Sequence, residues 1–453
     1  MKENSSLHQG LRRAVEGEVL ADDASRARYA TDASIYQMVP EAVVLPRSAD
    51  DVSAVMELAR DAETSVLPRG GGTSQCGQTV GRGIVLDNTR HMNRILEIDP
   101  DALTARVQPG VVLDTLNRAL APHGLWFPVD PSTASRCTLG GMAANNSSGG
   151  KSLRYGITRD NLRAIDAILP DGTRAHFNGA DPDPGPYADL VADMRALGRR
   201  EAEEIEARFP KVQRRVGGYN IDALTGNDVN MAHLLVGSEG TLAYFTELEL
   251  SLAPLPGEKV LGVCHFPSFY AAMDATQHLV TLDPMGVELV DDTMIALGRD
   301  IPLFAGTIDA FVEGEPAALL LVEFAEGSAD ANAAKLAQLA ERMGDLGFAF
   351  TGKGDRWGGM VPVTDKALQS AIAEYRKSGL NVMMSMKQAG KPISFVEDCA
   401  VALPDLADYT AGLTDIFARH GTKGTWYAHA SVGCLHVRPV LNMRLDQDVA
   451  TMR

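Results

Sequence analysis

Apolar and polar positions alternate in short blocks along the first part of the chain. Residues 42–45 form an apolar run typical of a buried strand. The Ser-Ala-Asp-Asp sequence at 48–51 predicts a capping box at the start of a helix. That helix would place Val52, Val55 and Ala59 on one apolar face.

The same alternation continues toward residue 172. We expect strands at 65–67, 83–87, 105–107 and 164–169, the last closed by a Pro-Asp-Gly turn. A helix carrying Leu113, Leu116 and Leu120 should end before Pro122 and Gly124. Short strands and helices with short connections indicate an α+β or α/β organisation.

The residue pattern changes near Pro254 and Pro256, which predicts a domain boundary there. Beyond it, apolar runs at 260–266, 286–290 and 317–324 predict strands, and the run at 270–279 predicts a helix. We expect an antiparallel sheet with helices on one face. The alanine-rich stretch at 330–343 has the spacing of a surface helix.

A glycine-rich loop follows the strand at 65–67. It consists of Pro68, Arg69, Gly70, Gly71, Gly72, Thr73 and Ser74. Glycines allow a sharp turn, successive N–H groups can form an anion-binding nest, and Arg69 adds a positive charge. The loop suits a diphosphate, and an ordinary glycine-rich turn is the alternative.

Two further segments are dense in small residues. The first, at 130–150, contains glycines, hydroxyl side chains and Asn and is followed by an Arg-Tyr-Gly sequence. It wraps a ligand or serves as a linker, and the flanking strands argue against a linker. The second, at 236–242, follows apolar Leu234 and Leu235 and by itself would be a turn that ends a strand.

The net charge and the cysteine content exclude several classes of partner and cofactor. A formal charge of −17 argues against nucleic acid and anionic membranes as partners. The five cysteines are scattered without a Cys-x-x-Cys pair, which excludes a disulfide framework and gives no iron–sulfur or structural zinc signature. The chain shows no signal peptide. We expect a cytoplasmic protein, with peripheral attachment at the inner membrane face as the alternative.

Taken together, the three small-residue segments resemble the flavin-binding half of the vanillyl-alcohol-oxidase/p-cresol-methylhydroxylase superfamily. Within it, the chain is most similar to the FAD-linked D-2-hydroxyacid dehydrogenases of the D-lactate and D-2-hydroxyglutarate types. The resemblance implies an α+β protein with a lead-in at 1–39 and an FAD-binding domain of two α/β subdomains at 40–252. Residues 253–453 would form the FAD-linked oxidase C-terminal (cap) domain, antiparallel sheet plus helices, in an incomplete form.

The resemblance implies FAD held without a covalent bond, because the first loop has no His and Cys76 lies just past its glycines. The residues that it implies at the cofactor are Pro68, Arg69, Gly70, Gly71, Gly72, Thr73, Ser74, Pro131, Ser132, Cys137, Thr138, Gly140, Gly141, Ala144, Asn145, Ser147, Gly149, Gly150, Arg154, Tyr155, Gly156, Glu239, Gly240 and Thr241.

Two histidines seven residues apart, His429 and His436, flank Gly433 and would converge if the chain turns there. A purely structural pair is the alternative. The family's segment reads His-Ala-Gly-Asp-Gly-x-x-His, from which Ser431 and Val432 depart. The resemblance implies that both histidines are catalytic and bind a divalent metal such as Zn or Mn.

Arg376 and Lys391 lie in stretches that resemble the family's substrate-binding segments. Either would pair with a substrate carboxylate, and Arg438 is a further anion contact. The alternative is that Arg376 and Lys391 are solvated surface cations.

The resemblance implies oxidation of a D-2-hydroxy acid to the 2-keto acid by hydride transfer to flavin N5. Electrons would pass on to a quinone, a cytochrome or another flavoprotein. In the family an acidic residue and a further His follow the His-x6-His segment, and this sequence ends at Arg453 before such a motif. We therefore expect a C-terminally truncated chain that needs a partner chain for the missing part.

Three other functions are weighed against this one. The first is a catalytically silent flavin-binding fragment, or half of a split enzyme. The second hypothesis, an enzyme of the same fold that acts on a nucleotide sugar, is less well supported, because the second half of the chain carries the histidine pair. Direct NAD dependence is disfavoured, since no strand–Gly-x-Gly-x-x-Gly–helix unit is present.

Overall fold

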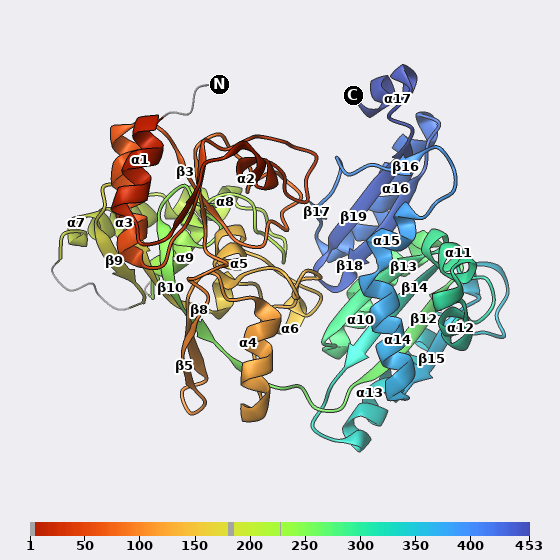
Figure 1. The fold of residues 1–453 in the computed structure, drawn as a ribbon. Coiled ribbons are helices and arrows are strands. Elements are labelled where there is room, and N and C mark those ends of the chain that lie inside the picture. The colour runs from red at the N-terminus through yellow and green to blue at the C-terminus, as the bar shows by residue number, and fades with distance from the viewer. Residues whose placement is uncertain (1–4, 180–184, 227) are drawn as a thin grey trace. The chain divides into compact units, whose positions relative to one another are not determined.

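The computed structural model describes residues 5–179, 185–226 and 228–453, and their contacts divide into two units (Figure 1). The first unit consists of Met1–Ser148, Tyr155–Phe209 and Val216–Leu255. The second consists of Pro256–Arg453 together with two short segments from the first half, Gly149–Arg154 and Pro210–Arg215.

The first unit begins with a four-stranded sheet in the order β1 (Glu18–Leu20), β2 (Ala42–Leu45), β4 (Ile84–Asp87) and β3 (Val66–Arg69). Strands β2 and β3 run parallel to β4, whereas β1 is antiparallel to β2. Helices α1 (Ser5–Ala14) and α3 (Ala49–Asp61) share one apolar cluster with this sheet. A shorter helix, α2 (Asp23–Arg28), lies between β1 and β2 in the chain.

The start of α3 confirms half of the predicted capping box. Ser48 caps the helix, with its hydroxyl oxygen accepting from the Asp51 N–H at 3.3 Å. The Asp51 carboxylate does not return to Ser48; it accepts from the N–H groups of Glu16, Gly17 and Arg47 at 2.8–3.0 Å. The Asp51 carboxylate therefore binds backbone N–H groups outside the helix, two of them more than 30 residues away in sequence, instead of the N–H of Ser48.

A second, fully antiparallel sheet in the first unit has the order β5 (Ile95–Asp99), β6 (Thr104–Val107), β10 (Tyr244–Ser251), β8 (Leu162–Ile168) and β9 (Arg174–Phe177). Buried residues of α4 (Leu113–Leu120), α5 (Leu139–Asn145), α7 (Ala188–Arg200) and α9 (Met231–Leu235) join it in one core. The unit also contains the two-stranded pair of β7 (Leu125–Trp126) with β11 (Ala253–Pro254) and helix α8 (Ala202–Arg208).

Two predictions in this unit were wrong in the type of element. Helix α5 lies inside the stretch predicted as one long loop, because Leu139, Met142 and Ala143 recur at helical spacing and all three are buried. Leu234 and Leu235 end helix α9 instead of a strand. Short apolar runs do not distinguish a strand from a turn of buried helix, so packing decided both cases.

The second unit is built on an eight-stranded antiparallel sheet. Seven strands follow the order β15 (Gly359–Val363), β12 (Val260–Phe266), β14 (Ala318–Phe324), β13 (Gly286–Asp291), β18 (Gly424–His429), β19 (Cys434–Leu441) and β16 (Lys391–Pro392), and β17 (Cys399–Ala400) also pairs with β19 (Figure 1).

Helices cover both faces of this sheet, so the prediction of helices on one face was wrong. Cys264 and Phe266 of β12 lie in one apolar cluster, whereas Leu261 and Val263 lie in another. The first cluster includes α10 (Phe269–Leu279), α13 (Ala329–Asp345) and α16 (Leu406–Arg419), and the second includes α11 (Asp292–Asp300), α12 (Pro302–Phe311), α14 (Lys366–Lys377) and α15 (Gly379–Met384). The uninterrupted apolar runs of β12 and β14 are the signature of strands buried on both faces.

The predicted helix at 330–343 is confirmed as α13. It buries Leu336, Leu339 and Met343 along one side and begins at an N-cap formed by Ser328. The last helix of the chain is α17 (Asp446–Met452). No helix in the described part of the chain has the length and apolar character needed to cross a membrane.

Candidate functional site

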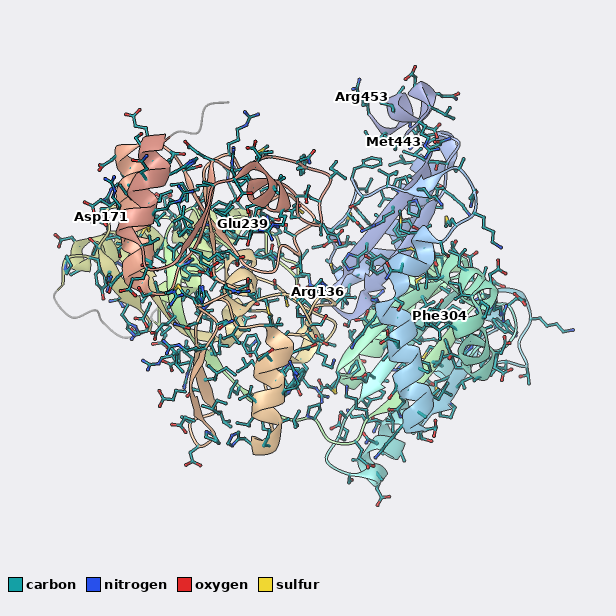
Figure 2. The ribbon with its side chains drawn as sticks, in the orientation of Figure 1. Arg136, Asp171, Glu239, Phe304, Met443 and Arg453 are labelled. Atoms are coloured by element: carbon teal, nitrogen blue, oxygen red, sulfur yellow. The ribbon has the colours of Figure 1, made fainter. Side chains whose placement is uncertain are left out.

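The first glycine loop lies directly against the second small-residue segment. A Cβ at Gly70 would come within 2.1 Å of the Thr138 hydroxyl oxygen, and one at Gly71 within 2.2 Å of the Arg136 carbonyl oxygen (Arg136 is labelled in Figure 2). Gly72 has a φ of +63°, which L side chains rarely adopt. Close approach and backbone conformation therefore both require the glycine triplet.

The backbone of this loop offers unused hydrogen-bond donors. The described residues provide no acceptor for the N–H groups of Gly71, Gly72, Thr73 and Ser74. Successive free N–H groups in a turn form an anion-binding concavity. The loop adjoins a pocket whose lining residues are Pro68, Arg69, Gly70, Asn88, Pro109, Thr138, Gly140, Gly141, Ala144, Gly240, Ala243 and Phe245.

The third small-residue segment packs on the same place. The Gly237 and Glu239 N–H groups donate to carbonyl oxygens of α5 at 2.9 and 3.0 Å. The Gln78 side-chain amide donates both to Asn145 and to Glu239, each at 3.2 Å (Glu239 is labelled in Figure 2). All three segments that sequence reasoning singled out thus converge in the first unit.

Buried polar atoms at this convergence fit a polar cofactor. The Gln78 Oε1, Asn146 Nδ2 and Ser238 Oγ atoms are buried and find no hydrogen-bond partner within the described residues. Leaving such atoms unsatisfied is costly, so a ligand that supplies donors and acceptors is the simplest explanation. The three loops accordingly fit the diphosphate and ring of a flavin.

Arg69 differs from its expected role. Its guanidinium donates to the carbonyl oxygens of Tyr29, Thr31 and Thr79 at 2.7–3.1 Å and lies over the Tyr29 ring. Burial lowers the pKa of Arg69, although nearby carboxylates oppose this. The side chain therefore fastens the segment around residues 29–31 to the loop, and the anion site depends on the backbone N–H groups.

The remaining predicted cofactor residues separate into two groups. In the first unit, Tyr155 lies edge-on to Trp126 at 5.4 Å, Gly156 has a φ of +73°, and burial raises the pKa of Cys137 to about 11. Three others have local contacts there: the Pro131 carbonyl accepts from Ala134, Ser147 Oγ accepts from Asn145, and Thr241 Oγ1 contacts the Tyr219 hydroxyl. Ser132 is exposed, and no side-chain contact of it is recorded among the described residues.

Gly149, Gly150 and Arg154 belong to the second unit instead. The Arg154 guanidinium donates to the Asp283 carbonyl at 2.7 Å and pairs with Glu326 at 3.3 Å. A Cβ at Gly150 would come within 2.5 Å of the Glu288 carboxylate. The end of the second small-residue segment therefore packs against the polar centre of the second unit.

The two predicted histidines lie on a β-hairpin of the second unit. Strands β18 and β19 pair in antiparallel register, and the chain turns at Gly433, whose φ is +63°. The His429 and His436 rings are 5.2 Å apart between centroids and nearly perpendicular, at 84°. The sequence-based expectation that a turn at Gly433 brings them together is confirmed.

Sequence reasoning missed Glu288 on β13, which joins two of the predicted residues. Its carboxylate lies 2.8 Å from His429 Nδ1 and also binds the Arg376 guanidinium. Burial alone would raise the pKa of Glu288, but the Arg376 charge and the hydrogen bond with His429 outweigh it and lower the pKa to about 2. A charged residue inside the apolar run at 286–290 was the signal that could have found it.

An ionised Glu288 determines the state of His429. Burial lowers the pKa of His429, and the neighbouring carboxylate only partly offsets this. A neutral ring beside an acceptor-only carboxylate carries its proton on Nδ1, which leaves Nε2 as the basic atom. The pair therefore has the arrangement of a general base held by a carboxylate.

His436 has a carboxylate partner of its own. Its Nδ1 lies 2.5 Å from Asp398, and its ring stacks on Tyr427 at 4.4 Å. The surrounding protein would raise the pKa of Asp398, but the hydrogen bond from His436 lowers it. Beside them, Arg438 and Glu397 form a buried ion pair at 2.5 Å.

The predicted carboxylate-binding cations are both engaged within the second unit. Besides Glu288, Arg376 contacts the Ala428 carbonyl at 3.3 Å and lies over the Tyr427 ring. The Lys391 ammonium donates to the Met386 carbonyl. Arg376 therefore lies in the histidine cluster, where the Glu288 carboxylate already balances its charge. None of the recorded contacts of Lys391 among the described residues reaches that cluster.

The residues fit a divalent metal poorly. Among the described residues one group of three donors lies within 4.8 Å, and it comprises Asp398, Cys434 and His436 without His429. Burial raises the pKa of the Cys434 thiol to about 11, so it is protonated near neutral pH. The Arg214 guanidinium lies beside that thiol, and a bound cation there would meet a positive charge.

Comparison with known protein families agrees with this picture. Residues 40–178 match the family described as FAD binding domain. Residues 255–453 match the family described as FAD linked oxidases, C-terminal domain. The two matches correspond to the part with the glycine loops and the part with the histidine hairpin.

Individual relatives are similar over most of this chain. A D-2-hydroxyglutarate dehydrogenase of Pseudomonas putida is 34% identical over 94% of this chain and 44% of its own length. The glycolate oxidase subunit GlcD of Bacillus subtilis is 29% identical over 93% of this chain and 78% of its own length. Among solved structures, p-cresol methylhydroxylase with substrate bound has a TM-score of 0.68 at 12% identity, covering 99% of this chain and 85% of its own.

The lengths of these relatives bear on the expected truncation. The chain spans less than half the length of the D-2-hydroxyglutarate dehydrogenases that it matches, but more than three quarters of the glycolate oxidase subunit. The comparisons thus do not support the expectation of a shortened chain that depends on a partner chain. The fold similarity confirms the predicted FAD-binding domain with an antiparallel, helix-covered sheet in the second half.

Proposed function

We propose that this chain, whose two halves match an FAD binding domain and the C-terminal domain of FAD linked oxidases, oxidises a D-2-hydroxy acid to the 2-keto acid. The observation that carries the proposal is the Glu288–His429 pair, a neutral imidazole held by an ionised carboxylate in a cluster that also contains His436. FAD, bound non-covalently through the three loops of the first unit, would supply an acceptor for the substrate's C2 hydride.

His429 would act as the general base. Its Nδ1–H donates to Glu288, so Nε2 can take the proton of the substrate hydroxyl as the C2–H bond breaks. The acid's two electrons leave with the hydride, and the hydroxyl carbon becomes a carbonyl. Glu288 would stabilise the imidazolium that forms, as a buried carboxylate does behind a catalytic histidine.

His436 would orient the same substrate oxygen. Asp398 and the stacked Tyr427 ring hold its imidazole from two directions, which limits rotation of the ring. With Nδ1 bound to Asp398, its Nε2 faces away from that carboxylate and is the atom available to the substrate.

The proposal extends to the substrate and to the electron acceptor. The relatives of this chain include both D-2-hydroxyglutarate and D-lactate dehydrogenases, so both acids are candidate substrates. Lys391 is proposed for a second carboxylate, and a quinone, cytochrome or flavoprotein for the electrons. A Zn or Mn ion at His429 and His436 was also predicted, but no step above requires it.

The visible spectrum of the purified, FAD-loaded chain tests the proposal. We expect the oxidised flavin band to bleach on anaerobic addition of D-2-hydroxyglutarate or D-lactate, and the L enantiomers to have no effect. His429→Asn should slow the bleaching by about 10²- to 10⁴-fold, the usual contribution of a general base.

Two outcomes would contradict the proposal in different ways. A flavin that stays oxidised with every 2-hydroxy acid would support a flavin-binding protein without dehydrogenase activity. A chain that takes up no FAD after reconstitution would contradict the site built from the three loops.

A further inference from the structure

Arg214 is a buried cation that sequence reasoning did not single out. It lies in the segment Pro210–Arg215, which belongs to the second unit although the chain on both sides of it belongs to the first. The residue is 7% exposed. Its Nη2 donates to the Gly149 carbonyl oxygen at 2.7 Å, and its Nε is buried without a hydrogen-bond partner among the described residues.

The other two arginines of the cluster form ion pairs, and none is recorded for Arg214 among the described residues. Arg376 binds the Glu288 carboxylate, and Arg438 binds that of Glu397. The recorded hydrogen-bond partners of Arg214 within the described chain are the Gly149 carbonyl and the Cys434 thiol, and neither is a carboxylate.

The Arg214 charge nonetheless faces the proposed catalytic groups. It lowers the pKa of Glu288, of Asp398 and of His429, although it is the largest cause for none of them. Residues of β13, β18 and the segment before β17 therefore all lie within range of this guanidinium.

A buried guanidinium with neutral partners is costly to maintain. Removing a cation from water without a paired anion is unfavourable, and protein interiors normally neutralise such a charge. The planar fork of an arginine matches a carboxylate through two parallel hydrogen bonds. Glu288 and Asp398 act on this charge without forming an ion pair with it, so a carboxylate that arrives beside the proposed general base would be its direct partner.

We propose that Arg214 binds the C1 carboxylate of the 2-hydroxy acid. This inference rests on the proposed function, and it gives Arg214 the contact that the sequence predicted for Arg376. Arg376 is then a positioning residue, which holds Glu288 and through it His429. Because every 2-hydroxy acid has a C1 carboxylate, Arg214 serves mono- and dicarboxylic substrates alike.

Oxalate binding to the FAD-loaded chain tests the assignment without turnover. We expect calorimetric titration to show a Kd for oxalate that rises roughly 10- to 100-fold in Arg214→Met, the usual contribution of a charge-assisted hydrogen bond. Arg215→Met is the matched control, since Arg215 is the next residue of the same segment and its guanidinium donates to the Pro210 carbonyl at 3.4 Å. Its Kd should equal that of the unsubstituted chain.

Substrate kinetics supply the second measurement. In Arg214→Met, the KM for D-lactate and for D-2-hydroxyglutarate should rise by similar factors. A rise for the dicarboxylate alone would overturn the assignment to C1. If Arg214→Met fails to fold, Arg214→Gln, whose amide can still donate to the Gly149 carbonyl, decides the question by the same titration.

The remaining outcomes separate this inference from the proposed function. Oxalate binding that depends on Arg214, with no flavin reduction by any acid, would keep the anion site and reject the dehydrogenase. Flavin reduction with unchanged oxalate binding in Arg214→Met would keep the dehydrogenase and reject Arg214 as the anion site. Oxalate binding that a chelator abolishes in the unsubstituted chain would assign the carboxylate to a metal and overturn the role of Arg214.

Discussion

At the scale of single residues, Glu288 connects the functional groups of the second unit. Its carboxylate contacts His429 on one oxygen and Arg376 on the other. With a pKa of about 2 it remains ionised throughout the physiological range. One side chain thus compensates a guanidinium and determines the protonation of the proposed base.

Replacing Glu288 by Gln should change the pH dependence of flavin reduction. Only neutral His429 can accept a proton, so the rate should rise with pH through the His429 pKa, which burial holds below the usual value for histidine. The carboxylate raises that pKa, so its loss should move the acidic limb to lower pH. The rate at the plateau should fall about 10²- to 10⁴-fold, because the tautomer and orientation of the ring are no longer fixed.

Stopped-flow measurement of flavin bleaching against pH checks this prediction. Glu323→Gln is the control, since Glu323 is on the neighbouring strand β14, forms an ion pair with Lys259 and has no recorded contact with the cluster among the described residues. An acidic limb that stays in place in Glu288→Gln would show that the two side chains are not coupled.

At the scale of elements, the first unit depends on close contact between β3, its glycine loop and α5. Gly70 lies against Thr138, and the same hydroxyl caps α5 by accepting from the Gly141 N–H at 3.3 Å. The loop and the helix start are therefore fitted to each other. A change in either should alter the cofactor site as well as stability.

Gly70→Ala should weaken FAD binding and destabilise the first unit. The added Cβ would overlap the Thr138 hydroxyl, and overpacking of this kind costs about 1–3 kcal/mol. Fluorescence titration with FAD and thermal unfolding measure the two effects. Gly217→Ala is the control, because a Cβ there would meet nothing within 4 Å. Equal FAD affinity in Gly70→Ala would contradict the assignment of this loop to the cofactor.

At the scale of the whole molecule, the described chain has two contact units with different polar centres. The first has backbone donors and uncharged polar atoms, and the second has a cluster of paired charges. The proposed flavin contacts at the three converging loops lie in the first unit. Cofactor binding should therefore stabilise one unit directly.

Calorimetry with and without FAD tests this difference. Chains of several domains often unfold in more than one transition, and a ligand raises the stability of the part that binds it. At about 100 times its Kd, FAD should add about 2.7 kcal/mol to the first unit. We expect one transition to move to higher temperature, and less so in Gly70→Ala. Identical traces with and without saturating FAD would contradict the prediction.

The sequence by itself determined the elements and the local motifs. Apolar runs predicted β2, β12 and β14 closely, and helical spacing predicted α4 and α13. Clustered small residues indicated the three loops, and the spacing of His429 and His436 around Gly433 indicated a hairpin. These signals are local: side-chain period, the conformational freedom of glycine and the reach of a tight turn act over fewer than about ten residues.

Only the tertiary structure decided the partners of the charged residues. Glu288 and His429 are 141 positions apart, Arg376 and Glu288 are 88 apart, and Arg214 meets Gly149 across 65. No periodicity relates such positions, so the sequence could not show that Arg376 is compensated or that Arg214 is not. The cost of burying a charge depends on what the fold brings beside it, and that depends on the packing of whole strands and helices.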